Sequence, residues 1–132
     1  MKRITPTQAK SLNDNFVKTR SKAIDKAIGK KDAISSWFSL EEIKDYIDYV
    51  EKEAKDRKIT INGIRVYFGA YGKNEDKSVK KNMSTVFMVP TTPKQGSQQK
   101  DGSGDPGGTD VGDMDGLNMG TLGDPPSATY PQ

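Results

Sequence analysis

Hydrophobic side chains recur every three or four residues near the start of the chain, which is the period of an α-helix with one apolar face. The face consists of Leu12, Phe16, Ala23 and Ala27. The sequence TPTQ supplies a start, because Thr5 suits the cap position and Gln8 stands where it completes a capping box. Gly29 is a typical helix end. We therefore predict a helix that begins near Pro6 and ends near Gly29.

The same spacing predicts a second helix from Leu40 to about Arg57. Ser39 and Glu42 form another capping box, shortly after the only tryptophan of the chain, Trp37. The expected core stripe comprises Leu40, Ile43, Ile47, Val50 and Ala54, with Tyr46 and Tyr49 beside it. Acidic residues gather in the first turn of this helix and basic residues in its last, as the helix dipole favours.

Alternation of side chains replaces helical spacing after residue 60, and this period is typical of strands. Ile64, Val66, Phe68 and Ala70 alternate with Arg65, Tyr67, Gly69 and Tyr71. We expect the first set to face the core. STVFMVPT, residues 84–91, predicts a second strand, and the polar stretch between the two is of hairpin type. Residues 34–38 are a candidate third strand of this antiparallel sheet.

The composition changes sharply after residue 90. Residues 91–132 contain nine glycines and five prolines, with two basic and six acidic side chains, whereas residues 1–90 contain 19 basic and 12 acidic side chains. A segment so poor in large apolar residues is typical of disorder. We predict an α+β fold: residues 1–92 form a small single domain, with two helices packed on a two- to three-stranded antiparallel sheet. Residues 93–132 form a disordered acidic tail, and we expect residues 94–132 to be removable without unfolding the rest.

Histidine and cysteine are both absent from the 132 residues. This removes the commonest catalytic bases, nucleophiles and zinc ligands, so we expect no enzyme activity, no cofactor and no metal site. The acidic stretch DVGDMDG does not match the ligand register of a calcium loop. The start of the chain lacks an apolar signal region, and no run of about 18 apolar residues occurs. We therefore expect a cytoplasmic protein that does not bind membranes.

Two surfaces are candidates for partner contact. The first is the outer face of the first strand, with Arg65, Tyr67 and Tyr71, together with the region of Trp37. An alternative places Tyr67 under the first helix and pairs Arg65 with a carboxylate of the second. The second candidate surface is a basic stripe on the first helix that comprises Lys18, Lys22, Lys26 and Lys30. Such a stripe suits the phosphates of a nucleic acid.

Three segments, SSWFSLEEIKDYIDYVEKEA, NGIRVYFGAY and STVFMVPT, together resemble a group of small uncharacterised bacterial proteins. The resemblance covers about residues 5–92 and implies a bacterial domain. It implies no activity, cofactor or site residue.

The expected function is that of a noncatalytic protein-binding or accessory module of a bacterial cytoplasm. The small core, the lack of nucleophile and base pairs, and the aromatic and cationic strand face favour this interpretation. Nucleic-acid binding through the basic helix is the alternative, and an enzyme that works without histidine or cysteine is a weaker one. A second copy of the chain at the edge of the small sheet is a further candidate partner.

Overall fold

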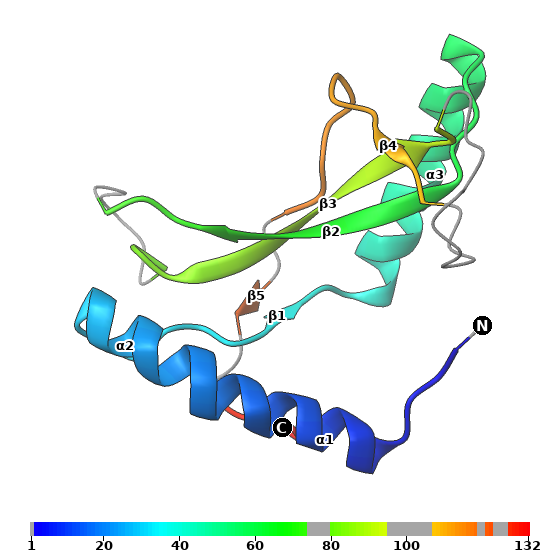
Figure 1. Ribbon diagram of the computed structural model, residues 1–132. Helices are drawn as coiled ribbons and strands as arrows, with labels where there is room; N and C mark the ends of the chain where they lie inside the picture. The colour runs from blue at the N-terminus through cyan, green and yellow to red at the C-terminus, as the bar shows by residue number, and fades with distance from the viewer. Residues whose placement is uncertain (1, 74–79, 95–106, 119–120, 123–126) are drawn as a thin grey trace. The chain divides into compact units, whose positions relative to one another are not determined.

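A computed structural model describes residues 2–73, 80–94, 107–118, 121–122 and 127–132 (Figure 1). They belong to two compact units that interleave along the chain. Unit 1 comprises Met1–Trp37, Gly69–Thr85 and Gly120–Gln132, and unit 2 comprises Phe38–Phe68 and Val86–Met119. Helices and an antiparallel three-stranded sheet are both present, so the predicted α+β class is confirmed.

The first helix of unit 1 runs without interruption through α1 (Pro6–Phe16), the π-helical turn η1 (Val17–Ser21) and α2 (Lys22–Ile28). The capping box of Thr5 and Gln8 is present, and the helix ends at Gly29, whose φ of 74° is left-handed. The predicted bounds are therefore confirmed. The π-helical turn was not predicted; within it the Thr19 hydroxyl donates to the Asn15 carbonyl oxygen over 2.6 Å.

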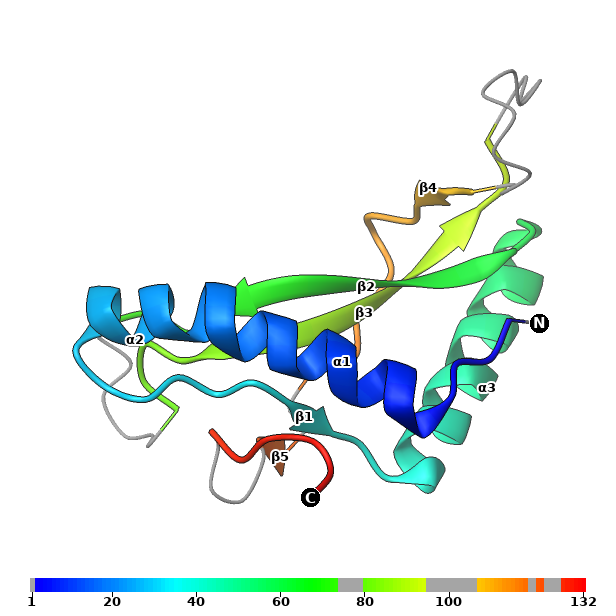
Figure 2. The ribbon, with the colours of Figure 1, turned by 60° about the horizontal axis from the view of Figure 1, so that its bottom comes forward.

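Strands β1 (Ser36–Trp37) and β5 (Thr121–Leu122) form a separate antiparallel pair in unit 1 (Figure 2). Ser36 lies opposite Leu122 and Trp37 opposite Thr121. The expectation that residues 34–38 would extend the main sheet is therefore wrong. Near α1, the backbone N–H of Tyr130 donates to the Asn13 side-chain oxygen over 3.0 Å, which brings the last residues of the chain beside the first helix.

A buried carboxylate also joins distant parts of unit 1. Asp32 is only 2% exposed, and it accepts hydrogen bonds from the backbone N–H of Ser84, over 2.6 Å, and from the Ser84 hydroxyl. Its own backbone N–H donates to the Asp25 carboxylate over 2.8 Å. These bonds connect the end of the first helix to the start of a strand 52 positions later.

The second helix, α3 (Leu40–Arg57), has the predicted bounds and the predicted capping box of Ser39 and Glu42. Its buried stripe differs from the expected one. Tyr46, Val50 and Ala54 are buried, whereas Leu40 is 75% exposed. Tyr46 was expected only to flank the stripe, so the covered face is rotated toward the tyrosines.

The main sheet contains β2 (Gly63–Ala70), β3 (Ser84–Thr92) and β4 (Thr109–Asp110), in the order β2-β3-β4 (Figure 1). The two long strands are the predicted ones. β4 pairs antiparallel with β3, so that Thr91 lies opposite Asp110 and Thr92 opposite Thr109. β2 is consequently an edge strand among the residues described.

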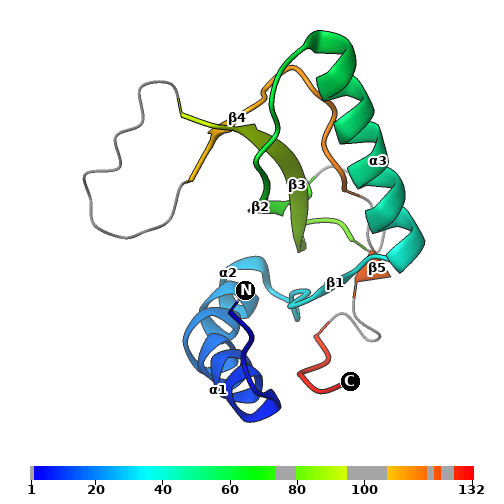
Figure 3. The same ribbon diagram turned by 90° about the vertical axis from the view of Figure 1, so that its right-hand side faces the viewer.

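The core of unit 2 combines α3 with a segment that was expected to be tail. Its buried residues are Tyr46, Val50, Val111 and Met114, and partly buried Tyr49, Ile61, Met88 and Leu117 pack against them. Figure 3 shows the segment that follows β4 running along α3. Paired backbone bonds between Met88 and Leu117, of 2.8 and 2.9 Å, attach this segment to β3.

The predicted tail boundary therefore needs correction. Residues 107–118 and 121–122 have defined structure, and residues 107–118 supply core side chains, so the predicted disorder is wrong for this segment. The physical reason is that Val111, Met114 and Leu117 are few but spaced three apart, and they pack in one cluster with Tyr46 and Val50 of α3. Residues 95–106, 119–120 and 123–126, also predicted to be disordered, lie outside the described residues.

Candidate functional site

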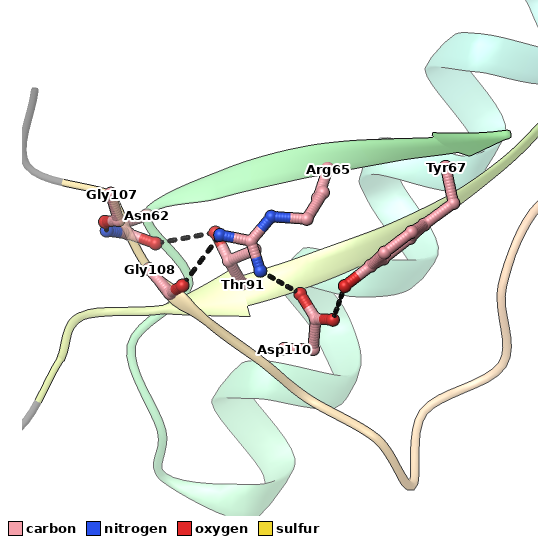
Figure 4. Close-up of polar contacts among 7 residues, drawn as sticks. All are labelled: Asn62, Arg65, Tyr67, Thr91, Gly107, Gly108 and Asp110. Carbon is pink, nitrogen blue, oxygen red and sulfur yellow. Dashed lines mark hydrogen bonds and ion pairs between the residues drawn. The ribbon is translucent and has the colours of Figure 1, made fainter.

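A cluster of polar contacts connects the start of β2 with the segment that leads into β4 (Figure 4). We call it the Arg65 cluster. Its members are Asn62, Arg65, Tyr67, Thr91, Gly107, Gly108 and Asp110. All of them belong to unit 2. The side chains of Arg65 and Tyr67 point to the same side of β2 because alternate residues of a strand share a face.

The Asp110 carboxylate is bound at both oxygens. The Arg65 guanidinium donates to one oxygen and forms an ion pair with it, and the Tyr67 hydroxyl donates to the other. Arg65 also donates to the Gly108 carbonyl oxygen over 2.8 Å. The pKa of Arg65 is raised, chiefly by the Tyr67 hydroxyl and also by the charge of Asp110, which together outweigh the opposing effect of burial. Arg65 thus binds both Gly108 and Asp110, the two ends of the segment 108–110.

The glycines of this segment allow a close backbone approach. The Thr91 hydroxyl donates to the Asn62 side-chain oxygen over 2.8 Å, and the Asn62 amide donates to the Gly107 carbonyl oxygen over 2.7 Å. A Cβ atom at Gly108 would stand 2.7 Å from the Thr91 Cβ and 2.8 Å from the Asn62 oxygen. Only glycine fits there without a shift of the backbone. Gly107 has a φ of 54°, which also favours glycine.

An open hollow of about 380 Å³ lies beside the cluster. It is lined by Asn62, Gly63, Ile64, Arg65, Val66, Thr91, Gly107 and Gly108. The polar side chains of this lining, from Asn62, Arg65 and Thr91, are already hydrogen-bonded within the chain. The side chains of this lining without a hydrogen bond to satisfy are apolar, those of Ile64 and Val66.

The predicted contact residues are only partly brought together. Arg65 and Tyr67 share the Arg65 cluster, and Tyr67 also stacks on Phe87, with ring centroids 5.3 Å apart. Both side chains are engaged by Asp110, yet they stay partly accessible, and Tyr67 is 36% exposed. Their use in partner contact stays a prediction. Arg65 does pair with a carboxylate, but not with one of α3. Trp37, which is 62% exposed, and Tyr71 belong to unit 1.

The face of β2 that was expected to be core is instead accessible. Ile64 is 38% exposed, Val66 53% and Phe68 87%. Alternation was predicted correctly, but the assignment of its two faces was wrong, because the core is completed by residues 111–117 against α3 and Met88. The sequence did not predict that Ile64, Val66 and Phe68 are surface residues. It also did not predict Asp110 as the partner of Arg65.

The basic stripe is exposed as predicted. Lys18, Lys22 and Lys26 are all accessible, and no ion pair with them occurs among the described residues. Lys30, also accessible, donates to the Lys81 carbonyl oxygen. Three lysines of the stripe are therefore exposed and form no ion pair among the described residues.

Comparisons with protein-family models, with characterised proteins and with solved structures gave no match. None of the helices in the described part of the chain has the length and apolar character needed to cross a membrane.

Proposed function

We propose that the chain is a noncatalytic protein-binding module that uses the outer edge and the apolar face of β2. The bacterial cytoplasm expected from the sequence is part of this proposal. The observation that carries it is the exposure of Ile64, Val66 and Phe68 along an edge strand. An edge strand offers unpaired backbone groups to a further strand, and alternate apolar side chains add affinity.

The composition of β2 supports this use. Soluble proteins usually protect an exposed edge with lysine, proline or a very short strand. β2 is eight residues long and contains neither lysine nor proline. Its only charged residue, Arg65, is paired with Asp110. Covering the exposed parts of three apolar side chains is worth about 1 kcal/mol each, in addition to the backbone bonds.

The noncatalytic part of the proposal is supported by the residues at hand. The chain contains no histidine or cysteine, and the polar side chains beside the hollow are bonded to one another. The Thr91 hydroxyl, for example, donates to the Asn62 side-chain oxygen, which is not a base that could activate it. An adjacent general base is a common means of activating a hydroxyl nucleophile.

Site-specific photo-crosslinking in cells that express the full chain tests the proposal. A benzoylphenylalanine placed at Val66 should form adducts with protein. The same group at Lys44, an exposed position of α3, is the matched control and should form few. Equal labelling from both positions, or no adduct from Val66, would contradict the proposed surface. Both substituted proteins must retain the wild-type circular dichroism spectrum.

Nucleic-acid binding is a second candidate, favoured by the unpaired charges of Lys18, Lys22 and Lys26. Phosphate contacts of this kind weaken steeply as salt rises. Charge reversal at Lys18 and Lys22 should abolish binding of single-stranded RNA or duplex DNA in fluorescence anisotropy. Reversal of Lys44 and Lys52, on α3, changes the net charge equally and should not. Equal losses, or no binding by the wild type at low salt, would exclude this candidate.

A further inference from the structure

We infer that the strand that pairs with β2 is β2 of a second copy of this chain, in antiparallel orientation about a two-fold axis at Val66. This inference rests on the proposed function and names the partner. It joins two three-stranded sheets edge to edge. A contact of this type is isologous, because each copy presents the same residues to the other.

Residues of similar type occur at equal distances on both sides of Val66 in β2, and this symmetry suits antiparallel pairing with a second copy. GIRVYFG, residues 63–69, has glycine at both ends, a large apolar residue next, and an Asp110-bound residue on each side of the central valine. In antiparallel register, residues whose numbers sum to 132 lie opposite each other. The facing pairs are Gly63 with Gly69, Ile64 with Phe68, Arg65 with Tyr67, and Val66 with itself.

Both faces of the joined sheet are compatible with these pairs. On one face Ile64, Val66 and Phe68 of each copy meet only apolar side chains, and directly opposite side chains in such a ladder lie about 5 Å apart. These are the accessible side chains of β2, from 38% to 87% exposed. The pairing therefore shields part of the apolar surface that the single chain leaves in water.

The charges on β2 also favour a second copy of the chain over an acidic or basic partner. On the other face the two Arg65 side chains are diagonal neighbours, at roughly 7–8 Å, and two free cations there would repel. Each is paired with the Asp110 carboxylate of its own chain, so the repulsion is offset. β2 offers no unpaired charge for an acidic or basic partner, whereas it matches a neutral apolar strand of its own length.

The size of the contact sets the expected strength. Seven facing pairs at one sheet edge bury less than the roughly 1,200 Å² of a stable standard interface. We therefore expect a reversible dimer whose population depends on concentration. Sedimentation velocity of the full chain should show the mean mass rising with concentration from one chain toward two. A monomer at every concentration would overturn the inference.

Charge substitutions at Val66 test the two-fold register. Val66→Lys places two lysines opposite each other and should weaken dimerisation by roughly tenfold or more, as should Val66→Glu. An equimolar mixture of the two variants should restore the dimer, because lysine then faces glutamate. Leu40→Lys, at another exposed apolar position, is the control and should leave the dimer unchanged. A mixture that stays monomeric, or an equal effect of Leu40→Lys, would overturn the register.

A thiol at position 66 provides a test that does not depend on a charged variant folding. The natural chain contains no cysteine, so Val66→Cys carries a single thiol. Mild oxidation should convert it to a disulfide-linked dimer, and Leu40→Cys should remain largely monomeric. Equal cross-linking of both would overturn the inference. If the photo-crosslinks from position 66 link the chain only to other proteins, the second copy is excluded and the protein-binding proposal stands. If no photo-crosslink forms, both the inference and the proposed function fail.

Discussion

Asp110 forms an ion pair with Arg65 across 45 positions of the sequence, and its second carboxylate oxygen accepts a hydrogen bond from Tyr67. This single side chain links β4 to β2 across the intervening strand β3, and it engages two of the side chains that were expected to meet a partner. Under the proposed function, a partner contacts the opposite side chains of β2 and its outer edge.

Removal of the Asp110 charge should loosen β4 at modest cost. The side chains of Arg65 and Asp110 are 37% and 32% exposed, so solvent screens the pair, and Asp110→Asn should lower the free energy of unfolding by about 1 kcal/mol. Asp113→Asn is the matched control, because Asp113 is 83% exposed in its pair with Arg57. Urea unfolding measures both. Equal effects of the two substitutions would show that Asp110 has no special role.

Gly108 should resist substitution more than a nearby glycine. Gly108→Ala brings a methyl group within 2.7 Å of Thr91, which forces the segment away from β3 and should cost about 1–3 kcal/mol. At Gly112 nothing lies within 4 Å of the added atom, so Gly112→Ala should change stability little. Thermal unfolding followed by circular dichroism compares the two. A similar midpoint for both variants would contradict the close approach at Gly108.

Removal of the segment beyond residue 93 should destabilise unit 2. It takes away Val111 and Met114, and the loss of a buried methionine side chain alone costs about 2–5 kcal/mol. A chain of residues 1–93 should therefore unfold at a clearly lower temperature than the full chain. Met114→Ala in the full chain should reproduce part of this loss. An unchanged midpoint for both would mean that residues 107–118 contribute nothing to the core.

Ionisation of the Tyr46 hydroxyl should lower the free energy of unfolding at high pH. Burial, followed by the charges of Tyr49 and Asp115, raises the pKa of the Tyr46 hydroxyl above its ordinary 10.0. The folded state therefore holds this proton to higher pH than the unfolded state does. Its stabilising contribution is complete below pH 10.0 and is lost as the pH rises toward the raised pKa.

Tyr46→Phe isolates this effect, since it lacks the hydroxyl that donates to the carbonyl oxygens of Met88 and Asp115. Below pH 10.0 the wild type should be more stable by about 1 kcal/mol. Urea unfolding at a series of alkaline pH values should show that difference shrinking. A difference that stays constant would contradict the role of the Tyr46 proton.

Local signals in the sequence were sufficient to predict the helices. A capping box joins residues three apart, and Gly29 ends its helix by its own backbone conformation, so neither depends on distant contacts. The two long strands were recognised for the same reason, because alternation is a property of neighbouring residues. The predicted bounds of α3, from Leu40 to about Arg57, agree with the observed ones.

Tertiary structure decided which faces are covered and which segments join. Alternation shows that Ile64 and Val66 share a face, but it does not say whether α3 or water meets that face. The composition of residues 107–118 suggested disorder, and only their contacts with α3 and β3 make Val111 and Met114 core residues. The ion pair of Arg65 with Asp110 spans 45 positions. Burial depends on what other parts of the chain supply, and no local pattern contains that information.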